Sequence, residues 1–203
     1  MKKLLSLLIA LTLLPLTSCD KGNEKTIYVA ASEIPHAEIL NEAIKPLLEE
    51  KGYKLEVKIL DWTLQNDGVL NGDYDANYFQ HRPYLEQFDS GSNEYNENYT
   101  YTKVFPTATV HFEPLRIYPG KKSADEFKDT KKESTYVICN DVSNEIRALD
   151  LLKASGVIDS YELDNKGNPI NLPNNIVPIA ENLLISSLID YDYAVLPTNT
   201  ALT

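Results

Sequence analysis

Cysteine is nearly absent from this chain, which has only Cys19 and Cys139 among its 203 residues. The three histidines suggest no Cys–His nucleophile, and His81 has no His, Cys or carboxylate at zinc-ligand spacing. A Gly-rich phosphate loop, a nucleophile elbow and a paired zinc motif are also missing. The sequence therefore does not indicate an enzyme, and we expect no metal and no cofactor.

Long apolar runs are missing too, except at the N-terminus, where an apolar stretch up to Leu16 follows two lysines. This run is short for a membrane span and is typical of a secretory signal. It ends in Leu16-Thr-Ser-Cys19, which has the spacing of a lipobox. We predict a lipoprotein signal peptide over residues 1–18, acylation of Cys19, and a tether over residues 19–25. The protein would then be anchored in the cell membrane, facing the periplasm or the cell exterior.

Acylation of Cys19 would leave Cys139 without an internal disulfide partner. It stands in the apolar run Tyr136-Val-Ile-Cys139, so we interpret it as a small buried hydrophobic residue. Basic residues are in the minority: removing Lys2 and Lys3 with the signal peptide changes the formal net charge from −11 to −13. This acidity, spread along the chain, argues against nucleic acid and against anionic lipid as partners.

Predicted strands and helices alternate along the chain, which indicates an α/β protein. Residues 104–118 look extended but are interrupted by two prolines, and two β/α lobes joined near residues 105–118 are the simplest architecture. Strands are predicted at residues 27–31, 55–59, 73 onward, 135–139, 175–180 and 193–196. Helices are predicted from Pro35 to Gly52, at residues 65–70, from about His81, from Ser123, before Gly156, and at residues 181–189.

The stretch from Asp73 to Tyr84 combines aromatic residues with amides, an imidazole and carboxylates. Aromatic faces beside a few fixed polar groups are typical of a pocket for a small amphipathic ligand. Asp73 and Asp75 would face the same side of a strand, and we interpret them as a solvated edge and not as an acid/base pair. We expect the stretch to lie at strand carboxyl ends, across a cleft from residues 140–147.

Arg147 lies near the start of a predicted helix, where the helix dipole disfavours a cation. It could bind an anion such as a ligand carboxylate, or it could be a surface residue paired with Asp150 or Glu145. Its position alone does not decide between the two. Trp62, the only tryptophan, could pack in the core or line the same cleft as Phe79 and Tyr84.

Several motifs occur in order along the chain, and together they resemble the methionine-binding lipoprotein family. These are the lipobox, residues 31–40 (ASEIPHAEIL), 75–81 (DANYFQH), 83–85 (PYL) and 110–115 (VHFEPL), and Asn140-Asp with Asn144 and Arg147. The resemblance implies a two-lobed fold like that of periplasmic binding proteins, closing around methionine. It also implies that an ABC importer permease and its ATPase are the partners.

Carried over by position, the resemblance puts an aromatic cage for the thioether at Trp62, Phe79 and Tyr84, with His81 alongside. It assigns Arg147 to the ligand carboxylate and Asn144 to the amide beside it, which favours the ligand interpretation of Arg147. A polarisable sulfur among aromatic faces is physically reasonable, at roughly 0.3–1.5 kcal/mol per contact.

The chain departs from the family pattern at three positions and in its length. Trp62 replaces a Tyr, Pro197 replaces an Asn that contacts the amino-acid head group, and Thr200 replaces a Tyr. Asn199 could take over the head-group contact. Because the chain stops at Thr203, before the family's last segment, the resemblance also implies an incomplete first lobe.

These observations predict a first lobe over residues 26–107, a second lobe over 108–198, and the start of a return crossover at 199–203. The alternatives to methionine are another apolar amino acid or a Met-containing dipeptide. A truncated surface lipoprotein that does not take part in transport is the alternative from a different functional class.

Overall fold

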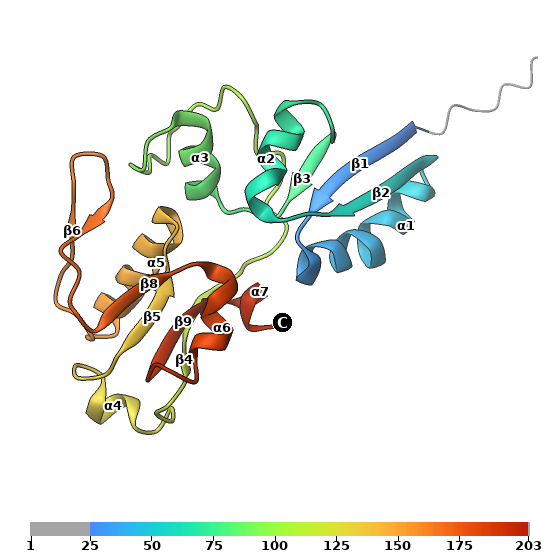
Figure 1. Ribbon diagram of the computed structural model, residues 1–203. Coiled ribbons are helices and arrows are strands. Elements are labelled where there is room, and N and C mark those ends of the chain that lie inside the picture. The colour runs from blue at the N-terminus through green and yellow to red at the C-terminus, as the bar shows by residue number, and fades with distance from the viewer. Residues whose placement is uncertain (1–24, 203) are drawn as a thin grey trace, which may run out of the picture.

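The computed structural model describes residues 25–202 and contains two α/β lobes, each built around its own sheet (Figure 1). The predicted signal peptide, Cys19 and all but the last residue of the tether lie outside the described residues, as does Thr203. The two sheets use strands from separate halves of the chain. The exact boundary between the lobes, placed between residues 107 and 108, remains a prediction.

The first lobe has a parallel sheet in the order β2-β1-β3. Its strands are β1 (Lys25–Ala31), β2 (Tyr53–Ile59) and β3 (Ala76–Tyr78). Parallel strands need crossover connections, and helical segments supply them. These are η1 (Glu33–Ala37), η2 (Leu40–Ile44) and α1 (Lys45–Glu49) after β1, and α2 (Trp62–Leu70) after β2. Helix α3 (Arg82–Ser90) follows β3 and leads into the connection to the second lobe.

The helical segment after β1 widens just before Pro46. The Lys45 N–H donates to the Leu40 carbonyl, five residues back, where η2 meets α1. A proline has no N–H to donate and crowds the preceding turn, so a wider turn at this point accommodates it. The segment ends at Gly52, whose φ of 77° is in the left-handed region that glycine tolerates best.

The second lobe has a four-stranded sheet in the order β4-β9-β5-β8, in which only β4 runs antiparallel to its neighbour. Its strands are β4 (Leu115–Pro119), β5 (Tyr136–Cys139), β8 (Ile176–Ile179) and β9 (Tyr193–Pro197), and β6 (Glu162–Leu163) pairs separately with β7 (Pro169–Ile170). Its helices are α4 (Phe127–Thr130), α5 (Val142–Ala154), η3 (Glu181–Leu183), α6 (Leu184–Ser187) and α7 (Thr198–Ala201).

The two lobes differ in how completely their central strands are covered. Every residue of β5 and β9 is buried, as expected for a sheet with both faces packed. In the first lobe, the central strand β1 buries only its last three residues, and Tyr28 stays half exposed. The largest core cluster accordingly lies in the second lobe.

Cys139 is buried and unpaired, as expected, and its thiol donates to the Asp141 carboxylate at 2.9 Å. Burial, followed by the nearby Asp141 charge, raises the pKa of this thiol, which disfavours the nucleophilic thiolate.

Several boundaries differ from the predictions. Residues 104–114 contain no strand, and β4 begins only at Leu115. Asp73 and Asp75 are exposed, as predicted, but they lie just before β3 and not within it, and the Asp75 carboxylate accepts from the Tyr28 N–H at 2.8 Å. Only Leu184–Ser187 of residues 181–189 is α-helical, after a 3₁₀ turn. Helix α2 begins earlier than predicted, at Trp62, because Asp61 caps it.

The long connection between the lobes is organised by Asp89, a buried carboxylate at the end of α3. It accepts hydrogen bonds from the Tyr99 hydroxyl and from the backbone N–H groups of Thr102, Lys103 and Val104. Burial alone would raise its pKa, but these hydrogen bonds lower the pKa of Asp89 to about 2. One ionised side chain therefore fixes a loop of mostly polar residues.

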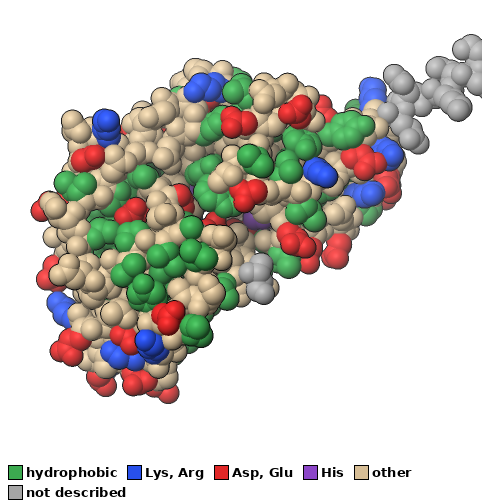
Figure 2. Space-filling view, viewed as in Figure 1, with side chains coloured by type: hydrophobic (Ala, Val, Ile, Leu, Met, Phe, Trp, Pro, Cys, Tyr) green, Lys and Arg blue, Asp and Glu red, His purple; other side chains and the backbone are tan. Residues whose placement is uncertain are grey.

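No helix among residues 25–202 combines the length and the apolar composition needed to cross a membrane. Figure 2 shows acidic side chains scattered over the visible face, in line with the spread of acidic residues in the sequence.

Candidate functional site

A pocket lies between the lobes, with a volume of about 450 Å³ including its open mouth. All seven residues predicted to bind ligand line it: Trp62, Phe79, His81, Tyr84, Asn144, Arg147 and Asn199. The first lobe supplies the first four and the second lobe the last three. The expected juxtaposition of the aromatic stretch and the start of α5 is therefore confirmed, while the binding roles of these residues remain predictions.

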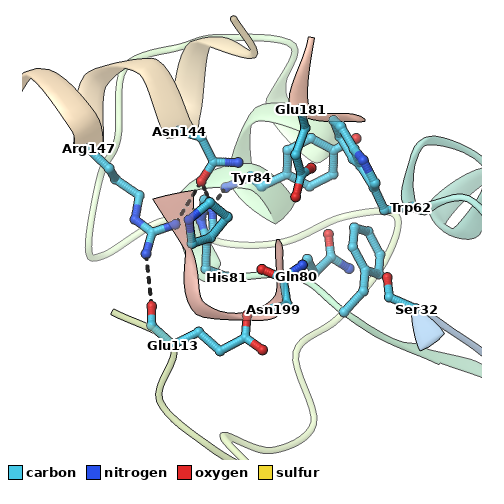
Figure 3. A pocket seen from close by; sticks show the side chains of 12 residues that line it. Ser32, Trp62, Gln80, His81, Tyr84, Glu113, Asn144, Arg147, Glu181 and Asn199 are labelled. Carbon is cyan, nitrogen blue, oxygen red and sulfur yellow. Dashed lines mark hydrogen bonds between the residues drawn. The ribbon is translucent and has the colours of Figure 1, made fainter. Parts of the chain in front are cut away.

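One side of the pocket is an aromatic wall, formed by Trp62, Phe79 and Tyr84. Figure 3 shows Trp62 and Tyr84 side by side. The Tyr84 ring meets the Trp62 ring edge-on at a centroid distance of 5.1 Å and the Phe79 ring at 5.7 Å. Such T-shaped pairs are favourable beyond the area they bury. Tyr84 is thus the centre of this wall, and burial raises the pKa of its hydroxyl to about 12.

Helix caps in the local sequence place two of these rings, Trp62 and Tyr84. Asp61 caps α2 by accepting from the Thr63 N–H at 2.9 Å, which fixes Trp62 as the first residue of that helix. His81 caps α3 in the same way, with Nδ1 accepting from the Tyr84 N–H at 3.3 Å. Each cap therefore holds a ring of the wall at the start of a helix.

The opposite side is a polar wall, formed by Asn144, Arg147, Glu181 and Asn199 of the second lobe. Asp141 caps α5 and accepts from the Asn144 N–H at 3.0 Å and from its side-chain amide at 2.8 Å. The side-chain amide oxygen of Asn144 (Oδ1) lies 2.7 Å from an Arg147 nitrogen and 3.0 Å from His81 Nε2. Asn144 therefore joins the two lobes (Figure 3).

Arg147 lies in the second turn of α5, one turn further from the helix start than the sequence suggested. Its guanidinium donates to Asn144 and to the backbone carbonyl of Glu113 at 3.2 Å. Within residues 25–202 no carboxylate comes within ion-pair distance of it, so the predicted alternative of a pair with Asp150 or Glu145 is wrong. The hydroxyl of Tyr161 donates to Asp150 instead.

Burial lowers the pKa of Arg147, against the opposing effect of Asp141 and Glu113. Burial also lowers the pKa of His81 to about 4, and the neighbouring Arg147 charge adds to the shift. His81 is therefore neutral near pH 7, and Arg147 is the positive charge at the pocket.

Five lining residues were not among the predicted ligand-binding residues: Ser32, Gln80, Glu113, Glu181 and Pro197. Ser32 directly follows β1 and Glu181 stands two residues after the end of β8, so the rule that ligands bind at strand carboxyl ends could have found both. Gln80 is held by amide hydrogen bonds to Asn66 and Asn77 behind the aromatic wall. These bonds also engage Asn77, which does not line the pocket.

Beside the pocket, His36, His111 and Glu113 form a group of residue types that can hold a metal ion, with ligand atoms within 4.8 Å of one another. Sequence spacing gave no sign of it, because His36 is far from the other two along the chain. Hydrogen bonds already engage two of the three: the Tyr78 hydroxyl contacts His111 Nδ1, and His111 Nε2 lies 2.8 Å from the Glu113 carboxylate. The group therefore works as a hydrogen-bonded link between β3 and residues 104–114 of the connection between the lobes.

Comparison with known proteins gives a consistent picture. Residues 27–202 match the family model described as NlpA lipoprotein. The methionine-binding lipoprotein MetQ of Bacillus subtilis is 40% identical over 172 residues, which are 77% of this chain and 59% of that protein. The membrane lipoprotein TpN32 of Treponema pallidum is 33% identical over 144 residues, 70% of this chain and 49% of that protein. The chain thus spans about half to three fifths of these relatives.

A solved structure of a nutrient binding protein from Burkholderia cenocepacia bound to methionine superposes with a TM-score of 0.69. The two sequences are 30% identical, and the match covers 87% of this chain and 73% of that one. The two-lobed α/β fold predicted from the sequence is therefore confirmed.

Proposed function

Because the chain belongs to the NlpA lipoprotein family, we propose that it binds methionine for an ABC importer and delivers it to the membrane permease, which works with its ATPase. The observation that carries this proposal is the pairing of walls across one pocket. The aromatic wall offers polarisable faces for a thioether, and Arg147 offers a guanidinium without a carboxylate partner in the described chain for the ligand carboxylate.

The anchoring belongs to the same proposal. Cys19, with its acyl chains, would hold the protein at the membrane, with residues 19–25 as a tether and the pocket between a first lobe (26–107) and a second lobe (108–198). The relatives named as lipoproteins support this anchoring. Such a protein would need no enzymatic activity, no cofactor and no nucleic acid.

Another apolar amino acid or a Met-containing dipeptide is the second candidate ligand. It is favoured by Trp62 and Pro197, which line the pocket where the family resemblance implies Tyr and Asn. Competition between methionine and norleucine, which lacks the sulfur, tests this. Methionine should bind more tightly than norleucine if the sulfur contacts contribute to affinity. Equal affinity of the two ligands would favour a general apolar site.

Titration calorimetry of the purified protein with methionine, for wild type and Arg147→Ala, tests the main proposal. Removing a charged hydrogen-bond donor to a carboxylate should weaken binding by about ten- to a hundredfold. Arg116→Ala is the matched control, since Arg116 is exposed on β4 and does not line the pocket.

Absence of binding by wild type would contradict methionine as the ligand and favour the surface lipoprotein that does not take part in transport. Equal affinity of wild type and Arg147→Ala would contradict the assignment of Arg147.

A further inference from the structure

Glu181 brings a carboxylate into the pocket that the family resemblance does not assign to the ligand. It stands two residues after the end of β8 and lines the pocket together with Arg147 and the aromatic wall (Figure 3). One of its carboxylate oxygens accepts from the Thr200 hydroxyl at 2.6 Å, and the Asn199 amide is a second donor. Both donors are neutral, so neither compensates the charge.

Three lining residues carry a formal charge: Arg147, Glu113 and Glu181. Glu113 uses its carboxylate on His111 and turns its backbone carbonyl toward Arg147. Asp141, just behind the pocket, is engaged in capping α5. Glu181 is therefore the lining carboxylate that is not engaged by a histidine or a cation within residues 25–202.

Burial raises the pKa of Glu181, and nearby Asp141 acts in the same direction. A carboxylate in such a position is costly when it is ionised and unpaired, and a cation brought close to it removes most of that cost. The pocket thus has one unpaired positive group, Arg147, and one uncompensated negative group, Glu181. Pro197 lines the same region and has no side-chain donor or acceptor.

We propose that Glu181 binds the α-ammonium group of an amino-acid ligand whose carboxylate is bound by Arg147. This proposal rests on the proposed function, because it takes the ligand to be a free amino acid. The two charges match a zwitterion, and the aromatic wall is left for the apolar side chain. Glu181 then determines specificity for ligands with a free amino group, while Asn199 and Thr200 orient its carboxylate.

Titration with two probes tests the proposal: methionine, and 4-(methylthio)butanoate, which has the same carboxylate and thioether but no ammonium group. The variant is Glu181→Gln, which keeps an oxygen that can accept from Thr200 and so should fold. It should weaken methionine binding by about ten- to a hundredfold, because a charge-assisted contact is lost. Binding of the desamino probe should stay equal or improve.

Thermal unfolding of the unliganded proteins should show the same or a higher midpoint for Glu181→Gln. Glu162→Gln, which changes an exposed glutamate on β6, is the matched control and should bind both probes like wild type.

If wild type binds methionine and Glu181→Gln binds it equally tightly, the Glu181 assignment is wrong while the proposed function stands. Equal loss for both probes would also overturn the assignment, since the effect would not depend on the ammonium group. If wild type does not bind methionine, the proposed function fails and this proposal fails with it.

Discussion

The aromatic wall and the polar wall face the same pocket, but different contacts hold them in place. In the aromatic wall, ring edges rest on ring faces around Tyr84, and the three residues lie close together in sequence. In the polar wall, hydrogen bonds run from the Asp141 cap through Asn144 to Arg147. Ring contacts depend mainly on shape, so the aromatic wall should tolerate substitutions that keep a ring. A hydrogen-bond chain needs each donor and acceptor in place.

The largest effect is expected at the centre of the aromatic wall. Tyr84→Ala removes the ring that both other rings contact, and we expect the free energy of unfolding to fall by about 3 kcal/mol. Tyr84→Phe keeps the ring and should cost less than about 1.5 kcal/mol. Urea unfolding of both variants measures the difference. Equal losses would show that the hydroxyl, and not the ring, organises this wall.

The two helix caps offer a direct comparison of the walls. Asp141→Ala removes the acceptor of three donors: the backbone N–H of Asn144, its side-chain amide, and the Ser143 hydroxyl. The free energy of unfolding should fall by about 2 kcal/mol. Asp61→Ala removes the exposed cap of α2 and should cost about 1 kcal/mol or less. Urea unfolding of both variants gives the two losses. A larger loss for Asp61→Ala would reverse the comparison, because the aromatic wall would then depend more on its cap.

We expect the free energy of unfolding to depend on pH through Glu145, which is buried in the first turn of α5 behind the polar wall. Burial, followed by the nearby Asp141 charge, raises the pKa of Glu145 to about 7 from an ordinary 4.5. The folded state therefore binds this proton more tightly than the unfolded state, and stability is lost as the pH rises from 4.5 to about 7.

Glu145→Gln should remove that loss, with a gain on the order of 1 kcal/mol at pH 8 and little change at pH 4. Urea unfolding at both pH values checks this, with Glu49→Gln, an exposed glutamate at the end of α1, as the control. A gain of equal size at both pH values would show that ionisation of Glu145 is not its cause.

The smallest effect is expected at Trp62. Trp62→Phe keeps a ring against Tyr84, so stability should change by only about 0.5 kcal/mol. Binding of methionine should persist with slightly altered affinity. Loss of binding in this variant, measured by calorimetry, would show that the aromatic wall needs the indole specifically.

Most of the strands and the positions of both walls could be predicted from the sequence. Apolar runs such as residues 27–31 and 135–139 mark buried strands, and strand carboxyl ends meet on one side of a sheet. The structure of residues 104–114 was harder to predict, because the sequence of an extended segment with prolines resembles that of a strand when its hydrogen-bond partners are unknown. Their hydrogen bonds depend on distant groups, such as Asp89 and Arg147.

The candidate site was predicted less completely than the fold. Arg147 could be assigned from the sequence only through the family resemblance, since its helix position alone left a surface ion pair open. His36 comes close to His111 and Glu113 only when the first lobe packs against residues 104–114 of the connection between the lobes. Such contacts between distant residues leave no periodic pattern in the sequence.

The cap at His81 has a consequence for ligand affinity. Since its Nδ1 accepts from the Tyr84 N–H, the neutral ring carries its proton on Nε2 and donates it to the Asn144 oxygen. The Asn144 amide is thereby oriented, with its NH₂ toward Asp141 and its oxygen shared with Arg147. Hydrogen bonds to Asn144 and to the Glu113 carbonyl thus orient the long arginine side chain. Such preorganisation lowers the conformational entropy that binding has to remove, so more of the contact energy is available as affinity.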